Sequence, residues 1–282
     1  MWVYLNGEVR LKDEIAISPD DRGFLFADGV YEVILSHDGR LFRAADHLER
    51  LRRSLRELKI QETDLITLRE VCRRLIEQNE LTDDEATVYI QITRGIAPRK
   101  HPFPPQNTVP TVYASASPFS PPEKEWAEGV KVILVPDIRW ARCDIKSVSL
   151  LPNVLASQQA MEAGAKEAVF VRDGAVTEGA HTSFAAVFGG VLVTYPLSHY
   201  ILPANTRQVV IELCRKMDIP VREYPIHGED LLMAEECMIL GTTTEVMPVV
   251  QVDEQKVGNG KPGPVTRRLQ AGLRELIRGE GV

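Results

Sequence analysis

Cysteine is scarce in this sequence, which has four cysteines among 282 residues: Cys72, Cys143, Cys214 and Cys237. They lie far apart and form no C-x-x-C pair, so a disulfide framework and a cysteine-rich zinc site are not expected. The pattern indicates reduced thiols in a cytoplasmic protein. Cys143 could serve as a redox thiol, but a packed structural cysteine is the simpler interpretation.

Long apolar runs and excess positive charge are also missing. No apolar run approaches the roughly 20 residues of a membrane-spanning helix, and the N-terminus lacks the basic and apolar regions of a signal peptide. Lys and Arg number 33 against 40 Asp and Glu, a formal net charge of -7. Because phosphates would be repelled overall, nucleic acid and anionic membranes are not expected as partners, although a local pocket for a small phosphate stays compatible with this charge.

Several motifs of other enzyme classes are absent. The six histidines show no H-x-x-x-H spacing, so no metal site is predicted. No G-x-S-x-G elbow occurs. A G-x-G-x-x-G match at 258–263 is followed by only 19 residues, too few to complete a dinucleotide-binding unit.

Hydrophobic periodicity and turn residues predict two lobes of mixed helix and strand, an α+β fold. We predict a small N-terminal α/β domain over residues 1–115, a Ser/Pro-rich linker over 116–122, and a large C-terminal α/β domain over 123–282. The predicted helices cover 46–58, 65–78, 149–163, 206–217 and 264–277. The predicted strands cover 2–5, 9–11, 30–35, 40–42, 87–93, 109–115, 130–135, 167–171, 175–177, 184–188, 191–194, 238–240 and 249–252.

Two side chains are candidates for chemistry in the larger predicted domain. Lys146 follows a predicted strand, and a neutral lysine amine can condense with an aldehyde. Burial or cations such as Arg139 and Arg142 would lower its pKa in the required direction. Glu178 ends a short strand before a glycine and could hold a protonated ring nitrogen. A surface lysine and a turn glutamate are the simpler interpretations of each segment by itself.

Three further segments suggest anion binding. Asn205 and Thr206 open a predicted helix, whose free amides suit a phosphate. Thr242 and Thr243 follow a predicted strand and a glycine, which lets backbone amides approach an anion. Arg50 could add a bidentate charge. Taken singly, a helix cap, a turn and a solvated helix face are the simpler interpretations of these residues.

A proline-bounded loop carries Arg99, Lys100 and His101. A stiff loop with Arg and His is suited to holding a carboxylate. For this segment by itself, an exposed basic loop without a ligand is the simpler interpretation.

In order along the chain, these segments resemble the class IV (fold type IV) pyridoxal-phosphate aminotransferases, and within them the bacterial D-amino acid aminotransferases. The resemblance covers nearly the whole chain. It is carried most specifically by the segments 21–33, 47–51, 93–101, 137–147, 177–179 and 242–245. It implies a two-domain fold type IV enzyme that binds pyridoxal 5'-phosphate between the domains, forms a homodimer, and transaminates D-amino acids such as D-alanine and D-glutamate with 2-oxo acids.

The resemblance also implies roles for single residues. Lys146 would be catalytic and bind the cofactor aldehyde, and Glu178 would hold the pyridine nitrogen. The phosphate and its surroundings would be bound by Arg50, Asn205, Thr206, Thr242 and Thr243. The substrate would be bound by Tyr31, Val33, Arg99 and His101, with the Arg99–His101 loop contributed by the partner subunit.

Two departures and several alternatives accompany this interpretation. His181 follows Glu178-Gly179 where the family often has serines, and the phosphate helix opens with Ala-Asn-Thr rather than Gly-Ile/Val-Thr. A branched-chain L-aminotransferase, an amine transaminase or an aminodeoxychorismate lyase would share the fold. A cofactor-binding protein without catalysis is a further alternative. The family's Arg-x-His loop favours the D-amino acid activity.

Overall fold

The computed structural model describes residues 1–61 and 63–279, and the chain divides into two units. Unit 1 comprises Met1–Pro121 together with Ile145–Ser149, and unit 2 comprises Pro122–Asp144 together with Leu150–Val282. The chain therefore leaves unit 2 for five residues and returns to it. Lys146 lies in that short segment, so it belongs to unit 1, whereas the bounds predicted from the sequence place it in the C-terminal domain.

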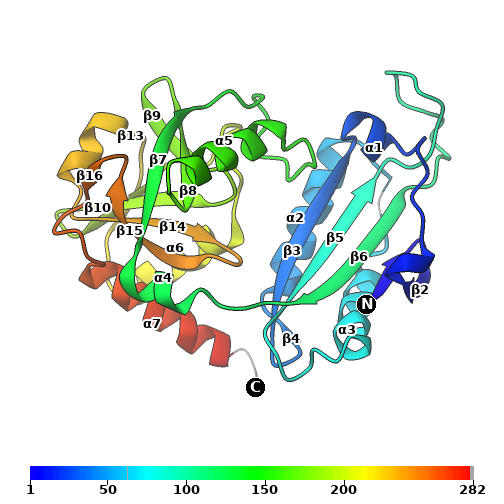
Figure 1. Cartoon of the computed structure of the whole chain (residues 1–282), viewed down its shortest axis with the longest axis horizontal. Helices are drawn as coiled ribbons and strands as arrows, with labels where there is room; N and C mark the ends of the chain where they lie inside the picture. The colour runs from blue at the N-terminus through cyan, green and yellow to red at the C-terminus, as the bar shows by residue number, and fades with distance from the viewer. Residues whose placement is uncertain (62, 280–282) are drawn as a thin grey trace. The chain divides into compact units, whose positions relative to one another are not determined.

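Unit 1 is built on a six-stranded antiparallel sheet in the order β2-β1-β6-β5-β3-β4. Its strands are β1 (Trp2–Leu5), β2 (Glu8–Leu11), β3 (Gly29–His37), β4 (Arg40–Leu41), β5 (Ala86–Thr93) and β6 (Thr111–Pro118). The long central strands lie side by side in Figure 1, with α2 (Ala44–Glu57) and α3 (Leu65–Gln78) beside them. A 3-10 turn (Lys12–Glu14) and a short helix, α1 (Arg22–Phe26), complete the unit.

The core of unit 1 follows from the periodicity of its sequence. Leu48, Leu51 and Leu55 recur at helical spacing on α2 and are buried with Leu68 and Leu75 of α3. The same core takes alternate residues of the central strands, because side chains of a strand point to opposite faces in turn. One face of the sheet is therefore covered by both helices.

Unit 2 is built on a ten-stranded mixed sheet in the order β12-β11-β10-β14-β15-β7-β8-β9-β13, with β16 paired to β15. An additional pairing of β9 with β10 closes six of these strands into a ring. The strands are β7 (Val130–Pro136), β8 (Glu167–Arg172), β9 (Ala175–Gly179), β10 (Ser183–Phe188), β11 (Val191–Thr194), β12 (Val221–Glu223), β13 (Ile226–His227), β14 (Glu236–Gly241), β15 (Glu245–Val252) and β16 (Gln255–Lys256).

The helices of unit 2 are α4 (Glu123–Glu128), α5 (Leu151–Glu162), α6 (Asn205–Lys216) and α7 (Pro264–Gly279), with a 3-10 segment over Gly228–Met233. Helix α7 packs against both α6 and β15. Helix α5 contacts β7 and β8, so it covers the parallel pair at which the chain crosses over. These helices and strands position the ends of β9 and β14 and the start of α6, where several candidate residues lie.

The structure corrects part of the predicted secondary structure. Strand β6 runs to Pro118, so it enters the segment predicted as a linker over 116–122, because residues 116–118 still pair with β5. The short elements α1, α4, β12, β13 and β16 were not predicted, since pieces of two to six residues carry too little periodicity to be seen. The long helices and strands lie where the sequence placed them, to within a few residues.

Candidate active site

Lys146 is held against strand β3 by backbone hydrogen bonds. Its carbonyl accepts from the Tyr31 amide at 3.0 Å, and Ser147 forms an isolated bridge with Val30. The Lys146 amide donates to the Ser54 hydroxyl of α2 at 3.3 Å. The Lys146 Nζ lies 4.3 Å from the centre of the Tyr31 ring. Two of the predicted site residues are therefore brought together.

The alternation of β3 separates the remaining candidates on that strand. Tyr31 and Val33 share one face, and Tyr31 packs near Tyr89 with ring centroids 5.9 Å apart. Glu32 points to the opposite face, toward α2. The predicted substrate residues and the charged cluster described next thus occupy opposite faces of one strand.

Arg50 is half of a buried ion pair. Its Nε donates to Glu32 at 2.9 Å and its Nη2 donates to the other carboxylate oxygen at 2.6 Å, a bidentate arrangement. The His47 ring nitrogen lies 3.1 Å from the same carboxylate. Burial opposes the charge on Glu32, but Arg50 and His47 together hold the pKa of this carboxyl far below its ordinary value. The guanidinium predicted to meet a phosphate is thus already bound to a carboxylate.

Glu178 lies at the end of β9 and is 5% exposed. One carboxylate oxygen accepts from Arg139 Nη1 at 2.6 Å, and the other accepts from the Leu202 amide at 2.9 Å. Burial raises the pKa of Glu178 to about 7, although Arg139 and the Leu202 amide both act to lower it. A cationic ligand against this carboxylate would favour its ionised form.

Arg139 has a role that the sequence analysis missed. Besides Glu178, its guanidinium binds both oxygens of Asp137 at 2.9 Å, and Arg172 Nε donates to Asp137 at 3.1 Å. From the sequence, Arg139 and Arg142 are expected to act as cations that lower the pKa of Lys146. Both arginines instead pair with carboxylates, Arg142 with Asp144. The signal that could have identified the Asp137–Arg139 and Arg142–Asp144 pairs is their two-residue spacing in the sequence.

The start of α6 carries an unsatisfied buried amide. Asn205 is the first residue of the helix and is 9% exposed, and its Nδ2 finds no partner among the described residues. The N-cap residue, Ala204, makes no side-chain cap, so the first-turn amides lack that partner as well. Leu202, which donates to Glu178, is three residues upstream of Asn205. The structure therefore brings Glu178 and this helix terminus together within unit 2.

The remaining phosphate candidates lie on the turn between β14 and β15. Thr242 and Thr243 are half-buried there, between Gly241 and the buried Thr244. The Thr244 carbonyl accepts from the Trp126 indole at 2.8 Å, which fixes one end of the turn. The two threonines therefore place hydroxyls and backbone amides at the end of β14.

The loop that carries Arg99 and His101 is exposed in unit 1. The His101 ring lies 5.5 Å from the Phe26 ring, and the Arg99 guanidinium carbon lies 5.2 Å from the centre of the same ring. Both predicted carboxylate-binding side chains thus lie around one aromatic residue of α1.

Two further residues noted in the sequence, His181 and Cys143, are accounted for by their surroundings. His181 lies 3.1 Å from Glu167, whose carboxylate is buried and also binds Thr182. Burial raises the pKa of Glu167, against the charge of His181. Cys143 is buried and its pKa is raised to about 11, chiefly by burial, so it remains a thiol at neutral pH.

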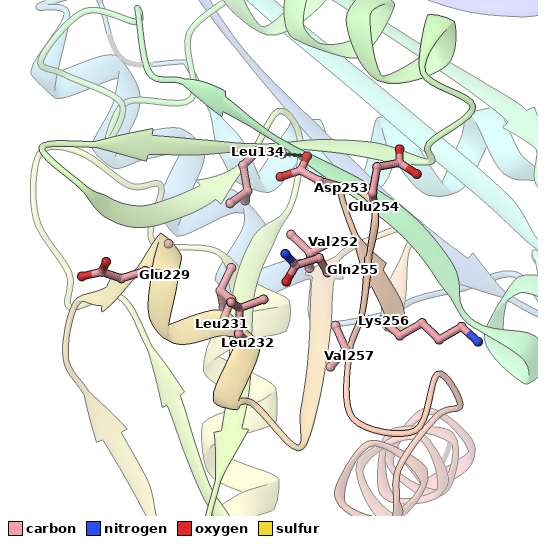
Figure 2. Close-up of a pocket in the computed structure, with 11 residues that line it drawn as sticks. Leu134, Glu229, Leu231, Leu232, Val252, Asp253, Glu254, Gln255, Lys256 and Val257 are labelled. Atoms are coloured by element: carbon pink, nitrogen blue, oxygen red, sulfur yellow. Dashed lines mark hydrogen bonds between the residues drawn. The ribbon is translucent and has the colours of Figure 1, made fainter.

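A separate cavity of about 350 Å³ lies in unit 2 beside the turn from β15 to β16 (Figure 2). Leu231, Val252 and Val257 form part of its wall, and Asp253 accepts from the Leu134 amide at 3.0 Å. It contains none of the predicted site residues. Within the described residues, no group of three His, Cys, Asp or Glu side chains could hold a metal, and no helix is long and apolar enough to cross a bilayer.

Comparisons with known proteins identify the family of this chain. The family model for amino-transferase class IV matches residues 29–252. The chain is 41% identical to D-alanine aminotransferase of Staphylococcus haemolyticus, over 98% of this chain and 97% of that protein. It is 40% identical to D-alanine aminotransferase of Bacillus licheniformis, over 99% of this chain and 98% of that protein.

Solved structures give the same fold. The branched-chain amino acid aminotransferase of Escherichia coli superposes with a TM-score of 0.89 at 28% identity, covering 99% of this chain and 95% of that one. The branched-chain aminotransferase of Thermoproteus uzoniensis, solved with norvaline, superposes with a TM-score of 0.87 at 25% identity, covering 100% of this chain and 96% of that one. The family resemblance and the fold type predicted from the sequence are confirmed: this chain belongs to the class IV aminotransferases.

Proposed function

We propose that this aminotransferase binds pyridoxal 5'-phosphate and transfers amino groups between D-amino acids and 2-oxo acids. The observation that carries the proposal is the pairing, in one unit, of a buried glutamate with a helix start whose first residue, Asn205, has a side-chain amide without a partner among the described residues. Glu178 and Asn205 are linked through Leu202, so an anion site and a cation site lie near each other. Pyridoxal 5'-phosphate has a phosphate and a protonatable ring nitrogen, the two groups that such a pair would bind.

The residues present fit the phosphate of this cofactor. A buried amide nitrogen without a partner costs about 1–3 kcal/mol, and an anion at the start of α6 would remove that cost for Asn205. The first-turn amides and the Thr206 hydroxyl would donate to the same anion. Thr242 and Thr243 would add donors from the turn after β14. Arg50 would add its charge while remaining paired with Glu32.

The residues also fit the reacting end of the cofactor. When bound, pyridoxal 5'-phosphate supplies an aldehyde that takes up an amino group and a ring that accepts electrons released at the substrate α-carbon. Glu178, oriented by Arg139 and the Leu202 amide, would keep the ring nitrogen protonated. Lys146 would bond to the aldehyde in the resting enzyme. In its neutral form it would accept the α-proton of the amino substrate.

Substrate recognition would rest on the residues that the family resemblance assigns to it. Tyr31 and Val33 share the face of β3 on which the Tyr31 ring approaches Lys146. Arg99 and His101 would bind the α-carboxylate of the substrate. In a homodimer, the loop that carries them would be contributed by the partner subunit. The full-length relatives named D-alanine aminotransferase support D-amino acids as substrates.

A homodimer is supported by an exposed apolar stripe on α5. Leu151, Val154, Leu155 and Met161 are each at least 56% exposed, and helical spacing places them on one face. Leu155→Asp should weaken self-association if this face is buried between copies, as measured by sedimentation equilibrium. Ile66→Asp on α3, an even more exposed position, is the control. The four buried, unpaired cysteines suit a reducing compartment, and we propose the cytoplasm.

The experiment that tests the proposal has two parts. The protein is loaded with pyridoxal 5'-phosphate and mixed separately with D-alanine and L-alanine, without a 2-oxo acid, while the cofactor absorbance is followed. We expect the absorbance to change with D-alanine only. A change with L-alanine alone would identify an L-aminotransferase, such as the branched-chain enzymes that share the fold. Turnover of a chorismate-type amine without any oxo acid would identify a lyase.

The second part locates the covalent bond. Reduction of the loaded protein with borohydride, followed by peptide mapping, should place the label on Lys146. Lys166→Ala is a control that should be labelled equally, since Lys166 pairs with Glu125 away from the predicted residues. A label on any other lysine would overturn the assignment of Lys146.

A further inference from the structure

Helix α1 and the segment that follows β5 form one hydrogen-bonded assembly within unit 1. The Arg22 amide donates to the Gly95 carbonyl at 3.0 Å, and the Ala97 amide donates to the Asp20 carbonyl at 3.2 Å. Asp21 and Ile96 form an isolated bridge between these contacts. The start of the Arg99–His101 loop is therefore fixed to the start of α1.

Arg22 then reaches the tip of that loop. Its Nη1 donates to the Lys100 carbonyl at 2.6 Å, and its Nη2 approaches the His101 carbonyl at 3.4 Å. Its Nε donates to Asp28 at 2.8 Å. Arg22 is 3% exposed, whereas Arg99 and His101 are exposed. A buried guanidinium thus holds the main chain of an exposed loop.

Phe26 contacts the side chains of the loop as Arg22 contacts its backbone. The Phe26 ring lies about equally far from the His101 ring and the Arg99 guanidinium, at 5.5 and 5.2 Å. The Arg22 guanidinium carbon lies 4.8 Å from the same ring. One face of α1 therefore fixes both the loop backbone and the two side chains predicted to bind carboxylate.

Arg94 fixes the far end of the loop through the same carboxylate. Its Nε and Nη2 donate to Asp28 at 2.7 and 2.9 Å, and its guanidinium carbon lies 3.8 Å from the Phe103 ring. Asp28 thus joins Arg22, which contacts the tip of the loop, to Arg94, which contacts its far end. The cluster has no role in the proposed proton transfer.

We propose that Arg22 and Phe26 are positioning residues that hold Arg99 and His101 in the geometry that binds the substrate carboxylate. The proposal rests on the proposed function, because it deepens the role given there to the loop. A carboxylate-binding pair must hold its donors within a fraction of an ångström, and proline alone restricts only φ. Hydrogen bonds from Arg22 to two successive carbonyls restrict the remaining rotations of the loop.

The first test is kinetic and uses the loaded enzyme. Arg22→Ala should raise the KM for D-alanine about 10- to 100-fold with little change in kcat, because carboxylate binding acts equally on ground and transition states. Arg22→Lys keeps the ion pair with Asp28 but lacks the planar fork, so it should restore thermal stability and only part of the KM. Phe26→Leu should raise the KM for D-alanine while leaving the ion pair between Arg22 and Asp28 in place. Arg74→Ala, an exposed arginine of α3, is the control.

The second test measures how readily trypsin cleaves the loop. Trypsin cleaves after Arg99 and Lys100, and cleavage after Lys100 requires release of the carbonyl that Arg22 binds. Arg22→Ala should therefore be cut at Lys100 at least tenfold faster than wild type, and faster than Arg74→Ala, at a temperature where each variant stays folded.

The outcomes separate this inference from the proposed function. If Arg99→Ala raises the KM for D-alanine and neither Arg22→Ala nor Phe26→Leu does, the inference is wrong and the carboxylate role of the loop stands. If Arg99→Ala leaves the KM unchanged, the role of the loop in the proposed function is wrong and the inference fails with it. Equal tryptic rates for Arg22→Ala and wild type would also overturn the inference.

Discussion

At the scale of single residues, the buried charges of this protein differ in what compensates them. Glu32 is compensated by a bidentate arginine and a histidine, so its pKa is held far below the ordinary range. Glu178 has one arginine contact and one amide contact, and burial dominates, so its pKa rises to about 7. The less compensated carboxylate is the one that we propose as a cofactor ligand, where a ring N–H would supply a second positive partner besides Arg139.

We expect Glu178→Gln to lower kcat for D-alanine about 100-fold, because a neutral amide cannot keep the ring nitrogen protonated. The variant keeps the shape of the side chain, so cofactor should still bind. Steady-state kinetics with saturating cofactor measures the effect, with the exposed Glu229→Gln as the matched control. A kcat within about threefold of wild type would refute the role given to Glu178.

At the scale of elements, the first turns of helices α7 and α6 differ in whether a side chain of the protein caps them. Helix α7 is capped from a neighbouring strand: the carboxylate of Glu236 on β14 accepts from the amides of Val265 and Thr266 at 2.9 and 2.8 Å. Helix α6 has no such cap, and its first residue carries the unsatisfied Asn205 amide. The capped terminus is satisfied within the fold, and the uncapped one suits a ligand.

Asn205→Ala should weaken the affinity for pyridoxal 5'-phosphate about tenfold and should not destabilise the cofactor-free protein, since the lost Nδ2 group has no partner there among the described residues. Fluorescence titration gives the affinity and thermal unfolding gives the stability. Gln208→Ala on the exposed side of the same helix is the control. A large loss of stability in the cofactor-free variant would show that Asn205 has a structural role instead.

Gly263→Ala should destabilise the protein by about 1–3 kcal/mol, because an added Cβ would overlap the Glu236 carboxylate that caps α7. Gly279 offers the matched control, since a Cβ there meets no atom within 4 Å among the described residues. The free energy of unfolding in urea measures both variants. Equal stability of Gly263→Ala and wild type would mean that the capping contact is not needed.

At the scale of the whole molecule, the two buried glutamates give opposite dependences of stability on pH. Because the folded pKa of Glu32 lies below its unfolded value of 4.5, the ionised side chain stabilises the fold above pH 4.5. This contribution is lost as the pH falls below 4.5 toward the folded pKa. The raised pKa of Glu178 favours the neutral acid, so its contribution is present below 4.5 and is lost as the pH rises toward about 7.

We therefore expect Glu32→Gln to flatten the loss of stability on acidification below pH 4.5. Glu178→Gln should flatten a decline between pH 4.5 and 7 in the cofactor-free protein, worth on the order of 3 kcal/mol. Urea unfolding at a series of pH values measures both slopes. Slopes that match wild type in both variants would show that other groups set the pH dependence.

The sequence by itself determined the long elements and the family. Helix α3 begins and ends at Leu65 and Gln78 as predicted, because its apolar residues repeat at helical spacing and Asp64 caps it. Local motifs such as Thr177-Glu178-Gly179 consist of consecutive residues, so they could be recognised without any structure.

Only the tertiary structure decided which charges meet. It paired Arg50 with Glu32, turned Arg139 toward Glu178, and joined Arg22 to the loop that follows β5. These partners are 18, 39 and 78 residues apart, and periodicity reports only which face of an element is buried. It also placed Lys146 in unit 1, because backbone hydrogen bonds to β3 hold a segment too short to show any pattern.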